Sequence, residues 1–137
     1  PQTMQAAPMA GDVLQQVLSF LELSAQAMQA LGVEKTRIVV DPGIGFGKTV
    51  AQNFTLLARQ RELLALGYPV LAGWSRKSSL GAVTGLDVGQ RLQPSVAAAL
   101  LAVERGARIV RVHDVRETVQ ALAVWRAMES SEAVGAP

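Results

Sequence analysis

Apolar residues recur first at helical spacing and then in short continuous runs, and this alternation repeats along the chain. Asp12 with Gln15 is typical of a helix N-cap, and Gly32 after Leu31 is typical of a helix end. The residues that predict this first helix by their spacing are Val13, Leu14, Val17, Leu18, Leu21, Ala25 and Met28.

Three short apolar runs predict strands. They are RIVVDPG from Arg37, YPVLAGWS from Tyr68 and ARIVRVHD from Ala107. The apolar residues of the first run do not alternate with polar ones, which favours a strand buried on both faces. Because strands joined by helical crossovers are parallel, we predict an α/β fold with three parallel strands and flanking helices.

The segments between and after the strands predict helices. These are expected from Thr49 or Asn53 through Leu64, around 76–83, around 94–105 and from Asp114 through Trp125. Gly67 and Gly106 are predicted to end two of them, and Asp114 with Glu117 to form a capping box. Residues 129–137 are expected to form a flexible tail.

Composition indicates one globular domain with an aliphatic core, since the 137 residues are 50% hydrophobic and only 4% aromatic. The absence of cysteine excludes disulfides and thiolate metal sites, and a single histidine excludes a multi-histidine zinc site. The net charge is +2, and no Lys/Arg run is interleaved with aromatics, so we expect no nucleic-acid partner. No apolar run approaches the roughly 20 residues of a membrane span. Because the chain begins with Pro1 rather than Met, we expect it to be part of a longer protein.

Each predicted strand ends in polar residues. Asp41 follows the first, 75–77 (Ser-Arg-Lys) follow the second, and Arg111 with His113 closes the third. The carboxyl ends of parallel strands form the rim where ligands bind in α/β folds. We therefore predict one binding site that is shared by these three strand ends.

The stretch DPGIGFGKT, residues 41–49, is not a nucleotide-binding loop. A P-loop requires glycine where Pro42 stands, and the dinucleotide pattern requires glycine where Lys48 stands. Its three glycines leave the backbone uncovered by side chains, as happens where a flat or bulky ligand approaches. The alternative is that Asp41 only caps the strand exit in an Asx turn.

The other two strand ends also have simpler interpretations. Residues 75–78 (SRKS) suit an ordinary helix N-cap, although two cations beside free N–H groups favour an anion site. Arg111 suits a solvated edge-strand arginine, and His113 by itself suits a structural histidine. Together they suit a phosphate clamp. Asp114 is expected to be only a helix cap.

Three motifs in this order, DPGIGFGKT, GWSRKS and RVHDV, resemble those of the dihydropteroate synthase family. The opening PQTMQ looks like the segment just after that family's fifth strand. The resemblance implies that residues 1–128 form the second half of a (β/α)8 TIM barrel. The first half of the family's barrel has no counterpart in this chain.

The family condenses 6-hydroxymethyl-7,8-dihydropterin pyrophosphate with p-aminobenzoate to 7,8-dihydropteroate and pyrophosphate. The resemblance thus implies a cytoplasmic transferase of folate biosynthesis, a sulfonamide target, with these two substrates as its partners. It implies Mg²⁺ as cofactor, held by a side chain of the missing first half, so that no metal ligand is expected here. It also implies a homodimer through the last two long helices, around 94–105 and 115–128.

The resemblance also implies roles for individual residues. Lys77, Arg111 and His113 are the implied catalytic residues. Asp41 would accept from the amino group and ring N–H of the pterin, and Lys77 would lie against the pterin. The implied substrate-binding residues are Asp41, Phe46, Gly73, Lys77, Ser78, Arg111 and His113. Of these, Ser78 would meet the p-aminobenzoate carboxylate, its ring would pack near Phe46, and Arg111 with His113 would hold the pyrophosphate.

Two alternatives remain open from the sequence. A pterin-binding methyltransferase-type barrel shares the aspartate that grips the pterin but passes a methyl group to a corrinoid, and it should lack a pyrophosphate clamp. Alternatively, the chain is a non-catalytic half-barrel that is inactive alone and dimerises, swaps or aggregates through its open strand edges.

Overall fold

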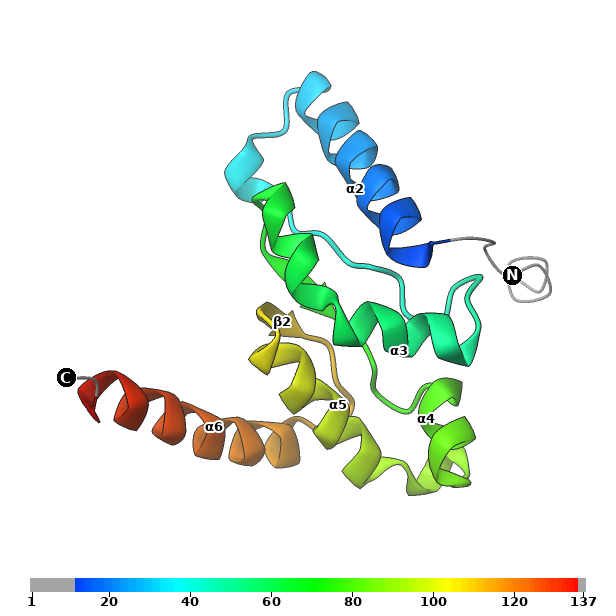
Figure 1. Cartoon of the computed structure of the whole chain (residues 1–137), viewed down its shortest axis with the longest axis vertical. Helices are drawn as coiled ribbons and strands as arrows, with labels where there is room; N and C mark the ends of the chain where they lie inside the picture. Colours follow the sequence, from blue (N-terminus) through cyan, green and yellow to red (C-terminus); the bar gives the residue numbers. More distant parts are fainter. Residues whose placement is uncertain (1–11, 136–137) are drawn as a thin grey trace.

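The computed structural model describes residues 12–135, with side chains up to residue 132, so the PQTMQ segment lies outside the described residues. In Figure 1, α2 and α6 occupy opposite ends of the molecule and the strands lie between them. The elements are α2 (Val13–Ala30), η1 (Lys35–Arg37), α3 (Val50–Ala58), η2 (Gln60–Leu66), β1 (Val70–Ala72), α4 (Ser78–Thr84), η3 (Val88–Gln90), α5 (Leu92–Glu104), β2 (Ala107–Val110) and α6 (Val115–Gly135).

Helix α2 begins where the sequence predicts. The Asp12 carboxylate accepts from the backbone N–H of Leu14 at 3.0 Å and of Gln15 at 3.3 Å, which satisfies donors that have no partner within the helix. Five of the seven apolar positions that the periodicity selects form the buried face, namely Val13, Leu14, Val17, Leu21 and Ala25, whereas Leu18 is partly buried and Met28 is exposed. This face packs towards α3 and η2.

The second predicted helix is interrupted. It begins at the Thr49 cap, as predicted, but the α-helix ends at Ala58 and the chain continues as the 3₁₀-helix η2. The tighter turn places the buried Gln60 amide on the last carbonyls of α5, at 2.8 Å from Ala102 O and 3.2 Å from Arg105 O. A single helix through Leu64 is therefore wrong, and the break links α3 to α5.

The sheet contains two parallel strands, β1 and β2, rather than the predicted three. The first apolar run contributes one isolated parallel bridge, between Val40 and Val70. Its two hydrogen bonds are Val40 N–H to Pro69 O at 2.9 Å and Leu71 N–H to Val40 O at 2.8 Å. The α/β class with parallel pairing is confirmed, and the prediction of three full strands is wrong.

Two prolines and a turn explain why this ladder stops after one pair. Continuing it forwards would require an N–H at Pro42, and continuing it backwards would require one at Pro69, and proline has none. The backbone N–H of Ile38 is already used by the 3₁₀ turn, donating to Lys35 O at 3.2 Å. The segment therefore lies alongside β1 without becoming a strand.

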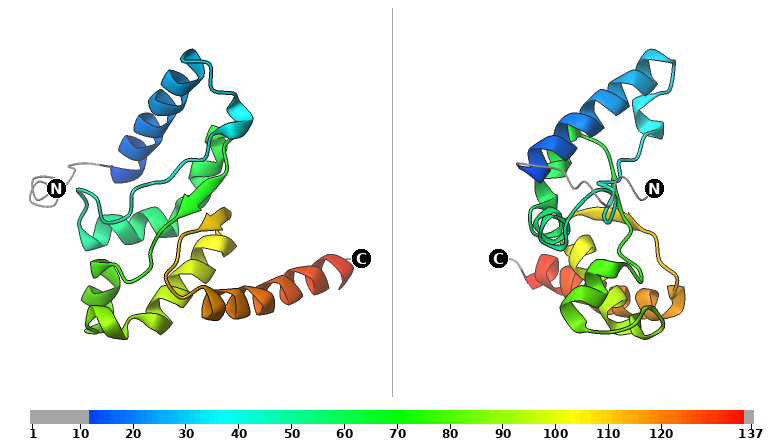
Figure 2. Two further views of the ribbon diagram at one scale, coloured as in Figure 1. Left: turned by 180° about the vertical axis from the view of Figure 1, so that it is seen from behind. Right: turned by 90° about the vertical axis from the view of Figure 1, so that its right-hand side faces the viewer.

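Only one face of the sheet is covered by the described helices. Val40, Val70 and Ala72 are buried in the core, whereas Val39 and Ile109 each remain 43% exposed. In the rear view the strands lie in the middle of the molecule, between α2 and α6 (Figure 2). Burial on both faces, as predicted, is thus wrong for the described residues, and an apolar strip remains on the open face.

The last helices begin close to their predicted positions. The predicted Asp114–Glu117 capping box is not among the contacts of the described residues, because the Asp114 carboxylate pairs with Arg76 and Glu117 pairs with Arg116. Helix α6 runs past the predicted boundary at residue 128 to Gly135, and the flexibility of 129–137 stays a prediction. Between residues 12 and 135 no helix is both long and apolar enough to cross a membrane.

We predict that the isolated 137-residue chain associates, because the open sheet face exposes apolar side chains beside unpaired strand edges. Light scattering should show dimers or larger species. A double variant, Val39→Gln with Ile109→Gln, should weaken this association because it makes the open face polar. A monodisperse monomer of the unmodified chain would contradict the prediction.

Candidate active site

The loop 41–49 is closed by its own charged side chains. The Asp41 carboxylate accepts from Gly43 N–H at 2.8 Å, which is the Asx turn considered above. The Lys48 ammonium donates to the carbonyls of Gly43 and Phe46, both at 2.8 Å. Burial lowers the pKa of Lys48, and Asp41 partly opposes this shift. Lys48 thus holds the loop closed, and the loop is not a P-loop in structure either.

Asn53 connects this loop to helix α4. Its side chain is 1% exposed, accepts from Gly45 N–H at 3.0 Å and donates to the hydroxyl of Ser79 at 2.9 Å. Gly45 adopts φ +88°, a left-handed conformation that glycine reaches at low cost. The sequence predicts Asn53 only as one of two alternative helix starts, so this connection was missed. An amide on the buried face of a helix is the signal that indicates it.

Lys77, the N-cap residue of α4, reaches across to the loop. Its ammonium donates to the carbonyl of Ile44 at 2.5 Å and lies 5.2 Å from the centroid of the Phe46 ring. Burial lowers the pKa of Lys77, the Arg111 charge lowers it further, and Asp41 opposes both. The Lys77 ammonium is therefore held against the loop that contains Asp41.

Arg111 follows the end of β2 and turns towards Asp41. Its guanidinium Nη1 lies 3.5 Å from the second carboxylate oxygen of Asp41. A Cβ at Gly73 would lie 2.5 Å from Arg111 Nη2, so glycine at this position leaves the path of the arginine clear. The guanidinium is 58% exposed, which makes the pair with Asp41 weak and available to exchange for a ligand.

His113 is positioned by Ser75, at the end of β1. The serine hydroxyl accepts from the backbone N–H of His113 at 3.1 Å and lies 2.7 Å from its ring Nδ1. These two contacts hold the Nδ1 edge of the ring against the serine, and His113 is exposed.

The structure brings together most of the predicted site residues. Arg111 lies against Asp41 and Gly73, Lys77 lies over Phe46, and the charges of Arg111 and Asp41 act on Lys77. His113 is held on Ser75, and a clamp that it would form with Arg111 stays a prediction. Ser78 is the exposed first residue of α4, directly after Lys77.

The charges of the site favour an anionic ligand. One carboxylate, Asp41, lies among the cations Lys48, Lys77 and Arg111. This donor set does not fit Mg²⁺, which prefers several oxygen ligands, and no group of three His, Asp or Glu residues within the described part of the chain could hold a metal. The arrangement is suited to binding phosphate oxygens beside a polar ring whose donors face Asp41.

Comparison with known proteins gives consistent matches along the chain. A family described as pterin binding enzyme matches residues 1–113. The dihydropteroate synthase of Haemophilus influenzae is 48% identical over 127 residues, which are 93% of this chain and 46% of that protein. The chain thus spans about half the length of the relatives it matches.

Solved structures match in the same way. Dihydropteroate synthase from Xanthomonas albilineans in complex with 7,8-dihydropteroate is 47% identical, with a TM-score of 0.88 over 95% of this chain and 48% of that one. The Thermus thermophilus enzyme in complex with 4-aminobenzoate is 47% identical, with a TM-score of 0.89 over 94% and 52%.

The pKa of Lys77 should respond in opposite directions to two of its charged neighbours, Arg111 and Asp41. Arg111→Gln removes a like charge and should raise this pKa, whereas Asp41→Asn removes an opposite charge and should lower it further. NMR titration of the Lys77 side chain measures both shifts. Identical titration curves in the three proteins would contradict the described geometry.

Replacing Asn53 by leucine should destabilise the protein by about 1–3 kcal/mol, because the hydrogen bonds of its buried amide with Gly45 N–H and the buried Ser79 hydroxyl are both lost. Ser79→Ala removes only one bond of Asn53 and should cost less. Urea unfolding of the full-length variants measures both losses. An Asn53→Leu variant as stable as the original protein would show that this connection does not stabilise the fold.

Proposed function

The chain belongs to the family of pterin-binding enzymes, and we propose that it forms the second half of a (β/α)8 barrel in a dihydropteroate synthase. The proposed reaction joins 6-hydroxymethyl-7,8-dihydropterin pyrophosphate to p-aminobenzoate and releases 7,8-dihydropteroate and pyrophosphate. Related structures support this proposal, since one contains 7,8-dihydropteroate and another contains 4-aminobenzoate.

The observation that carries the proposal is the convergence of three charged groups from different strand ends. The Asp41 carboxylate contacts the Arg111 guanidinium, and the Lys77 ammonium lies on the same loop that Asp41 begins. These residues lie far apart in the sequence and meet only because the strands are parallel. A carboxylate for ring donors and cations for phosphate are what the pterin substrate requires.

On this proposal Asp41 binds the pterin. Its carboxylate would accept from the amino group and the ring N–H, and a charged acceptor contributes about 1.5–3 kcal/mol per hydrogen bond. Lys77 would lie against the pterin, at its carbonyl edge, and the ring of Phe46 would pack near the p-aminobenzoate ring. Phe46 is 49% exposed and is free to make such a contact.

The same proposal assigns residues that bind the leaving group and the second substrate. Arg111 and His113 would hold the pyrophosphate, and Ser78 would meet the carboxylate of p-aminobenzoate. The methylene–oxygen bond breaks with its electrons leaving on pyrophosphate, the arylamine nitrogen bonds to the methylene, and the amine proton passes to solvent. Neutralising the charge that develops on pyrophosphate lowers this barrier, so no strong base is needed. Any Mg²⁺ would be held by residues outside this chain.

The chain's other expected properties belong to the same proposal. A homodimer would use α5 and α6, which expose apolar side chains, and the folate pathway implies a cytoplasmic location. The exposed apolar residues of these helices include Leu101, Val119, Val124 and Met128. Transfer of a methyl group to a corrinoid requires no pyrophosphate clamp, so the guanidinium beside Asp41 favours the synthase. The chain alone is proposed to be inactive, because the relatives are about twice as long.

In the full-length protein, Asp41→Asn and Lys77→Ala should each lower kcat/KM for pyrophosphate release by roughly ten- to hundredfold, the effect of losing one charged hydrogen bond. A matched control is Lys35→Ala. The Lys35 ammonium also lies over an aromatic ring, 5.2 Å from the centroid of Tyr68. Lys35 comes before the first apolar run in the chain and is not one of the proposed site residues. Rates equal to the original protein in both Asp41→Asn and Lys77→Ala would exclude the proposed function.

A further inference from the structure

Arg76 has a backbone conformation that its side chain does not favour. Among the described residues it is the only non-glycine residue with a positive φ, at +59°. It lies within a turn that is closed by Lys77 N–H donating to Trp74 O at 3.1 Å. Turn positions with positive φ ordinarily carry glycine or asparagine, so the surrounding structure must hold Arg76 in place.

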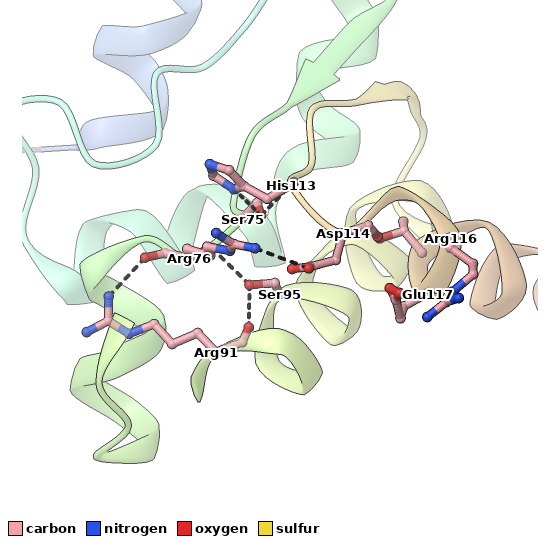
Figure 3. A network of polar contacts seen from close by, with 9 residues as sticks. Ser75, Arg76, Arg91, Ser95, His113, Asp114, Arg116 and Glu117 are labelled. Atoms are coloured by element: carbon pink, nitrogen blue, oxygen red, sulfur yellow. Dashed lines mark hydrogen bonds and ion pairs between the residues drawn. The ribbon is translucent and has the colours of Figure 1, made fainter. Parts of the chain in front are cut away.

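Three contacts hold this residue, two from the start of α5 and one from the residue before α6, as Figure 3 shows. Its backbone N–H donates to the hydroxyl of Ser95 at 2.9 Å, and its carbonyl accepts from Arg91 Nη1 at 2.9 Å. Its own guanidinium lies 3.1 Å from the Asp114 carboxylate, directly before α6. Both backbone groups and the side chain of one turn residue are thus fixed.

The residues that hold Arg76 are themselves fixed. Ser95 is 3% exposed and donates its hydroxyl proton to Arg91 O. The Arg91 side chain also donates to Leu86 O at 3.0 Å and lies where a Cβ of Gly81 would be. The start of α5 therefore provides a rigid support for the turn.

This turn directs two side chains of the site. Lys77, the next residue, reaches the carbonyl of Ile44, and Ser75, the preceding residue, holds His113. Asp114, which binds the Arg76 guanidinium, directly follows His113 in the chain. A change at Arg76 would therefore reach both Lys77 and His113.

We propose that Arg76 is a positioning residue, held in the left-handed conformation by Ser95, Arg91 and Asp114, which directs Lys77 and Ser75 without touching substrate. Its effect on catalysis rests on the proposed synthase function, whereas its effect on the position of Lys77 does not.

Glycine and alanine at position 76 separate conformation from charge, because both remove the guanidinium but only glycine tolerates positive φ. In the full-length protein, Arg76→Ala should lower kcat/KM about five- to thirtyfold, because the cost of the left-handed conformation is then no longer offset by the Asp114 contact. Arg76→Gly should retain at least about three times the kcat/KM of Arg76→Ala. Equal losses in the two variants would indicate that the guanidinium itself acts on substrate, and would overturn the proposal.

A second variant tests the support from α5. Ser95→Ala should lower kcat/KM when residue 76 is arginine, and this loss should shrink at least about threefold in an Arg76→Gly background, because glycine needs less support. An undiminished loss would overturn the role assigned to Ser95.

NMR titration of Lys77 gives a readout that does not depend on activity. Burial lowers the pKa of this residue, so Arg76→Ala should raise it towards its ordinary value and Arg76→Gly should raise it less. If the original protein shows no synthase activity, the proposed function fails but this titration still tests Arg76. An unchanged Lys77 titration in folded Arg76→Ala protein would overturn the inference.

Discussion

The hydrogen bond from the Lys77 ammonium to the carbonyl of Ile44 joins the two segments on which the site depends. One segment is the glycine-rich loop that begins at Asp41, and the other is the start of α4. This contact holds the Lys77 ammonium on the loop that carries the Asp41 carboxylate. The buried amide of Asn53 supports the same junction by binding Gly45 and Ser79. A half-buried lysine thus acts as a structural crosslink at the position where chemistry is proposed.

The short sheet determines where this junction lies. Pro42 and Pro69 limit the first apolar run to one bridge, so the chain leaves the sheet at Asp41 and turns at once into the glycine loop. Parallel pairing brings Arg111 to the same edge, where Gly73 leaves room for its guanidinium. The positions of the three charged groups therefore follow from backbone hydrogen bonding before any ligand is considered.

Features that depend on neighbouring residues could be predicted from the sequence. The Asp12 cap and the buried face of α2 follow from local spacing, and the grouping of Asp41, Lys77 and Arg111 follows from the rule that parallel strands end at one edge. The prediction of three strands was wrong because it rested on residue type alone. It did not allow for the backbone N–H groups that the two prolines lack. Counting N–H groups along the ladder would have corrected it.

Features that depend on distant partners could not be predicted. The partner of Asn53 lies 26 residues further along the chain, and local sequence shows only an amide on the buried face of a helix without indicating which residue it binds. The left-handed backbone of Arg76 is equally unpredictable, since only its contacts with Ser95 and Arg91 make the conformation stable. The break after Ala58 likewise reflects contacts of Gln60 with the end of α5.

The central claim is that the carboxylate, ammonium and guanidinium form one ligand site, and a crystal structure of the full-length protein soaked with pterin and pyrophosphate tests it most directly. The account predicts pterin density against the Asp41 carboxylate and Lys77, with pyrophosphate density beside Arg111. Ligand density elsewhere on the molecule, with these three groups free of it, would contradict the account.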